Sequence, residues 1–545
     1  MAGQVSPGIV LRERDLTNAV AVARQANTAA IVGSFEKGPV GVITTISTEQ
    51  ELLETFGKPN DNNYEDWYVA STFLSYGGTL RVVRVESSNL KNATDDSSDP
   101  LLRSLSDFES QQSTATFKFA ARTAGTLGNS LKVSVVDGSV ATYATATYNG
   151  AALWSSLAPA PATANDCHVA VIDEDGSISG VAGTLLETFL YVSRSTTSVD
   201  GEGASNYYPN VINRRSKYVY ANALTTAGAE SLSLVDGVDD YAVAVSGVSA
   251  ALDLFTDVEN ITIDFILSGG SFSSGAQPGT DTKTKQLKAI SIADARKDCI
   301  AFVSPYRDFV SLSNISDQRD AILAHFSAYP SSSYAVFDSG YKYIYDRFND
   351  KYRYIPCNGD VAGLCVQTSV NAEDWYSPAG LQRGNLRNAI KLAYTPTKSH
   401  RDELYLNRIN PITSFPGQGI VLFGDKTAQS TPSSFDRINV RRLFLNVERR
   451  VGEVARGVLF ELNDTTTRNS FFSTVNAYMA EVQAKRGVTD YLVVCDETNN
   501  TPDVIDRNEF VADLYLKPAR SINYITITFV ATKTGVSFQE VTGQV

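Results

Sequence analysis

The residues that could carry nucleophilic chemistry are a serine- and glycine-rich loop and three isolated histidines. The loop reads FILSGGSFSSG at 265–275, and it lacks the Gly-x-Ser-x-Gly pattern of a nucleophile elbow. A Ser–His–Asp triad would have to use His168, His325 or His400, and none of them stands in a recognisable catalytic context. The sequence therefore does not support hydrolysis by a serine nucleophile.

Phosphate and metal chemistry are equally poorly supported. The Walker spacing occurs nowhere, and the third glycine of GQGIVLFG at 417–424 falls two positions late for a dinucleotide loop. The five cysteines are scattered, with no CxxC pair and no zinc spacing. They are Cys167, Cys299, Cys357, Cys365 and Cys495. We therefore predict no enzymatic activity, no cofactor and no metal.

The remaining chemical feature is a cluster of arginines on the stretch 435–460. Apolar residues recur there at helical spacing, which predicts one buried stripe. They are Val440, Phe444, Val447, Val451, Val454, Ala455 and Val458. At about 100° per residue, Arg441, Arg449 and Arg456 lie beside that stripe, with Arg442 next to them. These guanidinium groups are expected to face outward, either as a solvated basic face or as a contact surface for an acidic partner.

Charge is distributed unevenly along the chain. The net charge is −13, yet residues 391–545 hold 18 basic and 17 acidic side chains, so residues 1–390 carry −14. Phosphate binding needs a basic surface, and the acidic body therefore argues against nucleic acid as the main partner. The near-neutral C-terminal part could instead dock onto something acidic, including a protein tube.

Length and composition indicate a multidomain protein made in a reducing cytosol. A chain of 545 residues is too long for one core and predicts about three or four domains. Unpaired cysteines suit a reducing compartment. The start MAGQVSPGIV does not resemble a signal peptide, and no run approaches the ~18 apolar residues of a membrane span. We therefore expect no membrane insertion.

The elements after the arginine stretch predict a module of two helices and a small sheet within 401–532. Asp464 can cap the second helix, and Gly487 stands where a helix C-terminus would need positive φ. The apolar face of that helix is Phe471, Phe472, Val475, Tyr478, Met479 and Val482. Strand-like runs follow at 491–496, 510–516 and 522–532.

The preceding chain divides by pattern into four segments. Residues 26–90 read as strand, helix, helix and strand, with Ser47 as a candidate cap of the first helix. Residues 91–114 have the polar composition of a linker, and 115–245 predict a β-rich insertion. Residues 246–400 alternate strands and helices, which is typical of an α/β domain. The overall prediction is a multidomain α+β and α/β protein.

Several motifs resemble contractile-tail sheath proteins of bacteriophages and related injection machines. The segment LNRINPITSFPGQGIVLFGDKT at 406–427 and the following INVRRLFLNVERRV are similar to the family's C-terminal domain. The opening SPGIVLRE and the stretch at 377–384 also resemble family motifs. One departure is Phe423-Gly424-Asp425-Lys426-Thr427, where the family usually has a Trp-Gly-Ala-Arg-Thr-like stretch.

The resemblance implies a structural subunit that forms stacked six-membered rings around an inner tail tube and contracts. It implies a central domain of subtilisin-like shape, an insertion on the outer surface, and a C-terminal domain facing the tube. Expected partners are further copies, the tube, baseplate and tail terminator proteins. The expected location is the virion, after assembly in the host cytoplasm. Alternatives are the sheath of a cellular contractile injection system and, from another class, a secreted hydrolase with a β-rich accessory domain.

Two terminal segments are expected to act as arms between subunits. Residues 1–25 and 533–545 can form strands but have no obvious partner of their own. We expect each arm to add a strand to the C-terminal sheet of a neighbour. The residues expected to make these contacts are Ser6, Pro7, Gly8, Ile9, Val10, Leu11, Val536 and Phe538.

Overall fold

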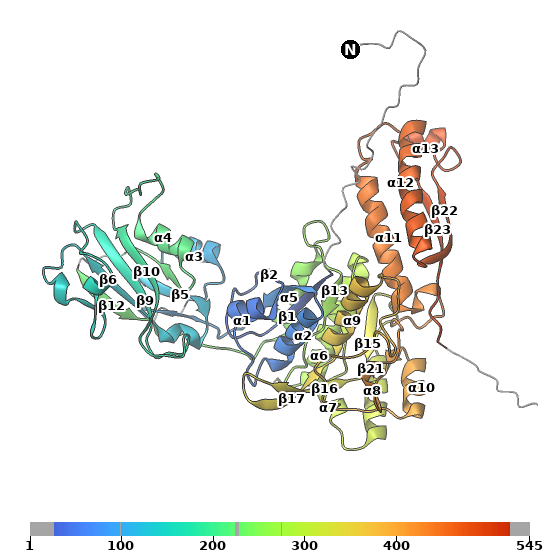
Figure 1. Ribbon diagram of the computed structural model, residues 1–545, viewed down its shortest axis with the longest axis horizontal. Helices are drawn as coiled ribbons and strands as arrows, with labels where there is room; N and C mark the ends of the chain where they lie inside the picture. Colours follow the sequence, from blue (N-terminus) through green and yellow to red (C-terminus); the bar gives the residue numbers. More distant parts are fainter. Residues whose placement is uncertain (1–26, 97, 99, 224–227, 274, 524–545) are drawn as a thin grey trace, which may run out of the picture. The chain divides into compact units, whose positions relative to one another are not determined.

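The computed structural model describes residues 27–523 apart from positions 97, 99, 224–227 and 274 (Figure 1). The arm residues named above lie outside these described residues. The chain forms two compact units. The first unit contains the residues up to 367 and Ala379–Ser430, and the second contains Thr368–Pro378 and the residues from Thr431 onward. Each unit is described by itself.

A seven-stranded sheet forms the centre of the first unit, in the order β19-β15-β14-β13-β1-β3-β2. Its strands are β1 (Thr28–Gly33), β2 (Thr44–Ile46), β3 (Thr79–Arg84), β13 (Phe265–Leu267), β14 (Ile300–Val303), β15 (Ala335–Asp338) and β19 (Ile409–Asn410). All neighbours pair in parallel except β2 and β3. The strands are short apolar runs because a parallel sheet is buried on both faces.

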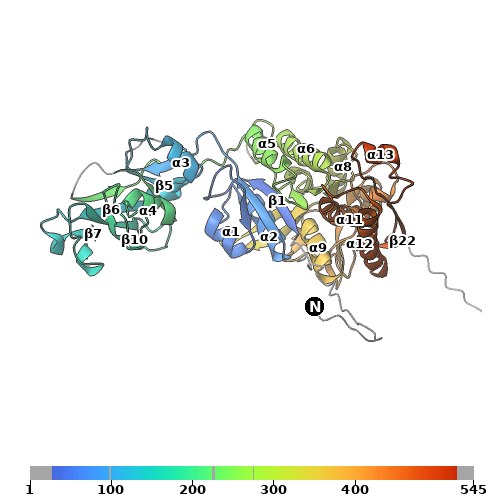
Figure 2. The same cartoon turned by 90° about the horizontal axis from the view of Figure 1, so that it is seen from above.

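Helices cover both faces of this sheet (Figure 2). On one face lie α5 (Val245–Asp253), α6 (Pro278–Arg296) and α8 (Ile315–Ser327), and on the other α1 (Glu49–Phe56), α2 (Tyr64–Ser75) and α9 (Asn358–Asn371). Alternate strand residues point to the two layers. Ile266 joins the cluster that contains Val248 of α5, whereas the Phe265 ring meets Phe73 of α2 edge-on.

Smaller elements complete this part of the first unit. A three-stranded sheet in the order β17-β16-β18 contains β16 (Tyr341–Asp346), β17 (Lys351–Pro356) and β18 (Lys391–Leu392). The remaining elements are α7 (Arg307–Val310), α10 (Lys398–Leu406), β20 (Ile412–Phe415), β21 (Gly419–Leu422) and the 3-10 helix η4 (Leu254–Thr256). A polar turn between Asp346 and Lys351 joins β16 to β17.

The described residues between β3 and α5 form three antiparallel sheets, the smallest of which pairs β7 with β8. The four-stranded sheet has the order β10-β9-β6-β12, with β6 (Leu131–Asp137), β9 (Asp166–Asp173), β10 (Thr184–Ser193) and β12 (Ala229–Ser233). The three-stranded sheet contains β4 (Asn92–Thr94), β5 (Phe119–Ala124) and β11 (Val219–Ala221). Also present are α3 (Leu105–Gln111), α4 (Tyr208–Arg215), β7 (Thr147–Asn149), β8 (Ala152–Leu153), η1 (Thr126–Ser130), η2 (Tyr143–Thr145) and η3 (Trp154–Ser156).

Three sequence-based boundaries need correction. The segment 91–114 is not a plain linker, because Asn92 is buried and its side chain donates to the Ala121 carbonyl 2.9 Å away, which holds β4 in the sheet. The cap of α1 is Thr48, which accepts from the Glu51 amide at 3.1 Å. A C-terminal domain beginning at 401 starts too early, since β19 pairs with β15.

The second unit contains α11 (Ile438–Arg456), α12 (Thr465–Ala484), α13 (Pro502–Asp506), β22 (Val488–Val494), β23 (Asp513–Pro518) and η5 (Ser434–Asp436). Asp464 caps α12 as predicted, accepting from the Thr467 amide at 2.8 Å. The prediction for Gly487 is wrong, because Arg486 takes the positive φ of 66°. Gly487 instead leaves room for a neighbour, since a Cβ there would lie 3.0 Å from the Trp375 ring.

A buried histidine makes the first unit sensitive to acid. His325 Nε2 lies 3.1 Å from Gln286 Oε1 and 3.0 Å from the Tyr329 hydroxyl, and burial lowers the pKa of His325 from 6.5 to about 4. The neutral ring contributes to the free energy of unfolding. This contribution is fully present above pH 6.5 and is lost as the pH falls towards 4, because the unfolded chain then takes up a proton that the folded chain does not. We expect His325→Gln to remove about 3 kcal/mol of the pH dependence of unfolding in this range, measured by urea denaturation. An unchanged slope would contradict this account.

Candidate functional site

The arginine-bearing helix α11 packs its N-terminal half into the core of the second unit. Leu443 and Val447 are buried against Phe471, Val475 and Met479 of α12. The interhelical packing follows from apolar residues at helical spacing on both helices. The predicted amphipathic character of α11 is therefore present, and the position of each arginine depends on its distance from this core.

Arg442 points into the unit, which contradicts the outward orientation expected from sequence. Arg442 is 5% exposed, and its guanidinium lies 2.9 Å from the Asp374 carboxylate and 2.5 Å from the Ser369 hydroxyl. Asn446 donates to the other Asp374 oxygen and accepts from the Tyr478 hydroxyl at 2.7 Å. Burial raises the pKa of Tyr478, which keeps this phenol a donor. The network connects α11, α12 and the 368–378 segment.

Arg441 is also buried, so the same expectation is wrong for it. The residue is 6% exposed, and its guanidinium carbon lies 4.0 Å from the centre of the Phe435 ring. Desolvated contacts of this cation–π type can contribute about 2 kcal/mol. Arg441 therefore helps to attach the segment before α11 to the helix.

Two of the four predicted residues remain accessible. Arg449 is half-buried and Arg456 is exposed, in the last two turns of α11. Between them, Arg450 lies 3.6 Å from Glu453. The structure therefore separates the predicted stripe into a buried pair near the start of the helix and a less buried pair further along it.

The loop after α11 carries an apolar tip that the sequence reasoning missed. Leu459, Phe460 and Leu462 are 63%, 104% and 78% exposed. Phe460 also has a φ of 70°, which is rare for a bulky residue. The pattern extended the helix to residue 460, whereas α11 ends at Arg456. The polar Asn463 and Asp464 immediately after the tip were the available signal for an exposed turn.

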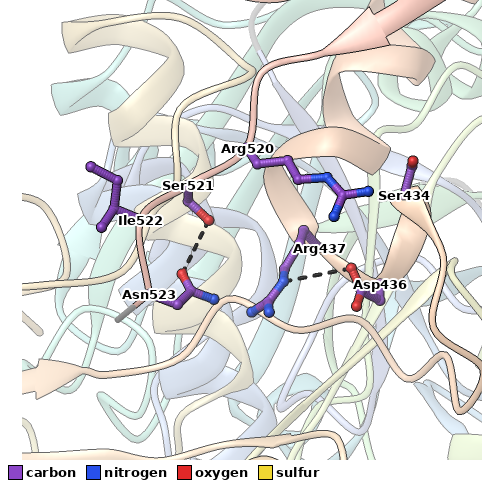
Figure 3. A pocket seen from close by; sticks show the side chains of 7 residues that line it. All are labelled: Ser434, Asp436, Arg437, Arg520, Ser521, Ile522 and Asn523. Atoms are coloured by element: carbon purple, nitrogen blue, oxygen red, sulfur yellow. Dashed lines mark hydrogen bonds and ion pairs between the residues drawn. The ribbon is translucent and has the colours of Figure 1, made fainter. Parts of the chain in front are cut away.

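A polar pocket of about 320 Å³ lies beside the N-terminus of α11 (Figure 3). Two guanidinium groups, those of Arg437 and Arg520, line it from different parts of the second unit. The other lining residues are Ser434, Asp436, Ser521, Ile522 and Asn523. Arg437 lies 3.5 Å from Asp436, and Ser521 donates to Asn523 at 3.3 Å. Such a lining suits a carboxylate better than an apolar group.

The strands β22 and β23 form a two-stranded sheet in the described part of the second unit. One face packs against α12 through Val488 and Val493. On the other face Leu492 and Tyr515 stand opposite each other and are 57% and 60% exposed. Two strands are marginal by themselves, and their edges are able to accept further strands.

The groups considered for enzymatic chemistry are engaged in structural contacts. His168 accepts from the Tyr191 amide at 3.0 Å and lies 3.0 Å from the Pro159 carbonyl. All five cysteines are buried, and burial raises the pKa of the thiols of Cys167, Cys299, Cys357 and Cys495. Within the described ranges no three His, Cys, Asp or Glu side chains are grouped to hold a metal ion. No described helix has the length and apolar character to cross a membrane.

Three domain families match the chain in order. They are the domain III N-terminal region of tail sheath protein Gp18 at 27–85, the phage tail sheath protein central domain at 276–428 and the phage tail sheath C-terminal domain at 430–532. The boundary between the last two agrees with the division of the structure at Ser430.

Similar proteins cover the whole chain. The tail sheath protein of Enterobacteria phage T4 is 31% identical, over 99% of both chains, and that of Vibrio phage KVP40 is 31% identical over 99% of this chain and all of its own. A sheath tail protein from Listeria innocua is similar in fold, with a TM-score of 0.55, 12% identity and coverage of 90% and 95%. The helical sheath of the anti-feeding prophage in its contracted state is also similar in fold, with a TM-score of 0.52 and 12% identity. The match covers 97% of this chain and 100% of the prophage chain.

The Arg442 network predicts a strong effect on stability. We expect Arg442→Met to cost about 3 kcal/mol in the free energy of unfolding, because it leaves Asp374 without its cation. Arg456→Met is the matched control, and an exposed position should change stability by less than about 0.5 kcal/mol. Chemical denaturation of the full chain measures both. Equal losses in the two variants would show that Arg442 has no special structural role.

Proposed function

Because the chain belongs to the phage tail sheath protein family, we propose that it is the repeating subunit of a contractile tail sheath that surrounds an inner tail tube. The observation that carries this proposal is the match along the full length to two phage tail sheath proteins. The subunits would polymerise as stacked six-membered rings. Contraction would release the free-energy difference between two packings of the same domains and drive the tube through the host envelope.

The proposed organisation assigns a role to each part of the chain. The central α/β domain, of subtilisin-like shape, would be the body of the ring. The β-rich insertion at 115–245 would lie on the outer surface, and the C-terminal domain would face the tube. The terminal segments 1–25 and 533–545 would connect subunits. Fold alone does not specify these roles, so each needs its own test.

The proposed partners are further copies of the chain, the tube, and baseplate and tail terminator proteins. The proposed location is the tail of the virion, after assembly in the host cytoplasm. An excess of acidic residues disfavours nucleic acid as a partner.

Two alternatives remain distinct from this proposal. The first alternative, the sheath of a cellular injection system, is supported by similarity of fold to an anti-feeding prophage sheath at 12% identity. The phage tail sheath proteins are 31% identical to this chain, which favours a phage tail sheath over this alternative. A secreted hydrolase is disfavoured because His168 and His325 are both held by buried structural contacts.

The tube contact is assigned to the accessible end of α11. Arg456 ends α11, and the apolar tip Leu459–Leu462 follows it, which supports a mixed basic and apolar contact that Arg449 extends along the helix. Because Arg441 and Arg442 are buried, we no longer include them in this surface.

Reversing the charge of the accessible pair tests this assignment. We expect Arg449→Glu with Arg456→Glu to weaken binding to purified tube by up to about thirtyfold per subunit, since each of the two exposed ion pairs contributes ~0–1 kcal/mol. The control is Arg507→Glu, an exposed arginine of the same unit. Co-sedimentation with tube at several salt concentrations is the measurement. Normal attachment by the double variant would leave the pair as a solvated face.

The sheet β22–β23 is the proposed acceptor of the arms. Its two described strands have exposed apolar residues and edges that can pair with further strands. Each added backbone hydrogen bond contributes roughly 0.5–1.5 kcal/mol net, so an arm of several residues contributes a few kcal/mol per junction. Repeated at each subunit, such junctions would keep the sheath connected during contraction.

Deletion of the N-terminal arm tests both the arm and the function. We expect the full chain to form hollow tubes or rings in negative-stain electron microscopy. Deletion of residues 1–20 should give folded monomers, with an unchanged melting temperature, that do not polymerise. If the shortened chain polymerises normally or unfolds, the segment is not an exchanged arm. A full chain that never polymerises would contradict the sheath proposal itself.

A further inference from the structure

A ladder of four tyrosines covers the outer face of the β16–β17 hairpin, and the functions discussed above make no use of it. Alternate residues of the two strands share this face, so Tyr343 stands opposite Tyr354 and Tyr345 opposite Tyr352. The ring centres of the first pair are 4.6 Å apart and those of the second 5.2 Å. Tyr343 also stacks on Tyr352 at 5.4 Å. We call these four residues the tyrosine ladder.

Two of the four rings are solvent-exposed, Tyr343 and Tyr354 are half-buried, and the opposite face of the hairpin is buried. Tyr345 and Tyr352 are 47% and 58% exposed, whereas Lys342, Ile344 and Asp346 of the inner face are buried. Exposed aromatic side chains gathered on one rigid sheet are typical of protein interfaces, because they bury a large area at little entropic cost. The ladder therefore needs a partner outside the hairpin.

One cation lies directly against the ladder. Lys391 Nζ lies 4.5 Å from the centre of the Tyr343 ring and 5.8 Å from that of Tyr354. The hairpin's own cations Arg347, Lys351 and Arg353 already pair with carboxylates of the same unit. The partner that fits this surface is therefore apolar, with an acidic group to meet Lys391.

The chain itself contains a surface of that kind in the segment 253–259, which follows α5. Leu254 and Val258 are 38% and 43% exposed. Asp257, between them in sequence, and Glu259, which follows Val258, are also exposed. The segment contains no basic residue. We call it the acidic turn. Its apolar and acidic groups complement the aromatic and basic groups of the ladder.

The ladder and the acidic turn are separate patches of the first unit. The hairpin packs against α2, where the Tyr68 hydroxyl donates to Asp346 at 2.7 Å and Arg353 lies 4.5 Å from the Tyr64 ring centre. The acidic turn follows α5, which lies with α6 on the face of the sheet opposite to α2 (Figure 2). The two patches therefore belong to different elements, and each has exposed side chains.

We propose that the tyrosine ladder of one subunit binds the acidic turn of a second copy of this chain. Contact between two different patches is head-to-tail, so it can repeat from copy to copy and build rings or helices. The inference rests on the proposed sheath function and adds the residues of one contact within it.

Removing the exposed rings is the first test. We expect Tyr345→Ser with Tyr352→Ser to raise the protein concentration needed for polymerisation by about tenfold or more, as truncation of central aromatic contacts does. The control is Tyr191→Ser, since Tyr191 is 46% exposed in the insertion. Melting temperatures of all variants are measured alongside. If the double variant polymerises like the control, the ladder is not a contact between copies.

Exchanging the charges is the second test and identifies the partner surface. Lys391→Glu and Glu259→Lys should each impair polymerisation severalfold by placing like charges together. Combining both changes in one chain should restore assembly to within about twofold of the wild type. If the double variant polymerises worse than either single variant, the ladder does not bind the acidic turn. This result would leave the sheath function standing, provided that the wild type forms normal tubes. A wild-type chain that fails to assemble at any concentration would overturn the function and this contact together.

Discussion

The pairing of β1 with β13 is the contact on which the rest of the first unit depends. It joins Ala29 to Phe265 across more than two hundred residues, and the Asp264 carboxylate accepts from the Thr28 amide at 2.9 Å. The chain between these strands must leave the sheet after β3 and return before β13. Both ends of the insertion are therefore fixed by strands of one sheet. The register of these strands also sets the positions of the helices on both faces.

Buried charged groups are a second recurring constraint. Lys342 lies 2.9 Å from Asp360, which also accepts from the Tyr76 hydroxyl, and all three are buried. In the second unit Arg442 and Asp374 have a comparable arrangement. A buried charge without its partner is strongly destabilising, so these pairs specify how the surrounding elements pack.

The function proposed for this protein uses contact surfaces. Buried titratable groups such as Glu65, whose pKa is raised by burial to about 7, contact neighbouring elements of the same unit. The accessible features are the end of α11 with its apolar tip, the β22–β23 sheet and the tyrosine ladder. In the proposed polymer each contact would be repeated in every subunit, so individually weak surfaces would suffice.

Local sequence determined the elements whose signals are local. The apolar spacing of α11, the Asp464 cap of α12 and the polar turn between β16 and β17 could be identified from the residues alone, and the ordered motifs identified the family. These features depend on neighbours within a few positions, where helical and strand periodicities apply.

Tertiary structure decided which polar and charged side chains turn inward. Arg442 lies inside because Asp374, far away in sequence, is placed beside it, and the glycine at 487 is needed because Trp375 packs there. The tyrosines at 343, 345, 352 and 354 share an exposed face only because the inner face of their hairpin packs on α2. Such contacts arise from the folded chain, and local periodicity carries no information about the partner.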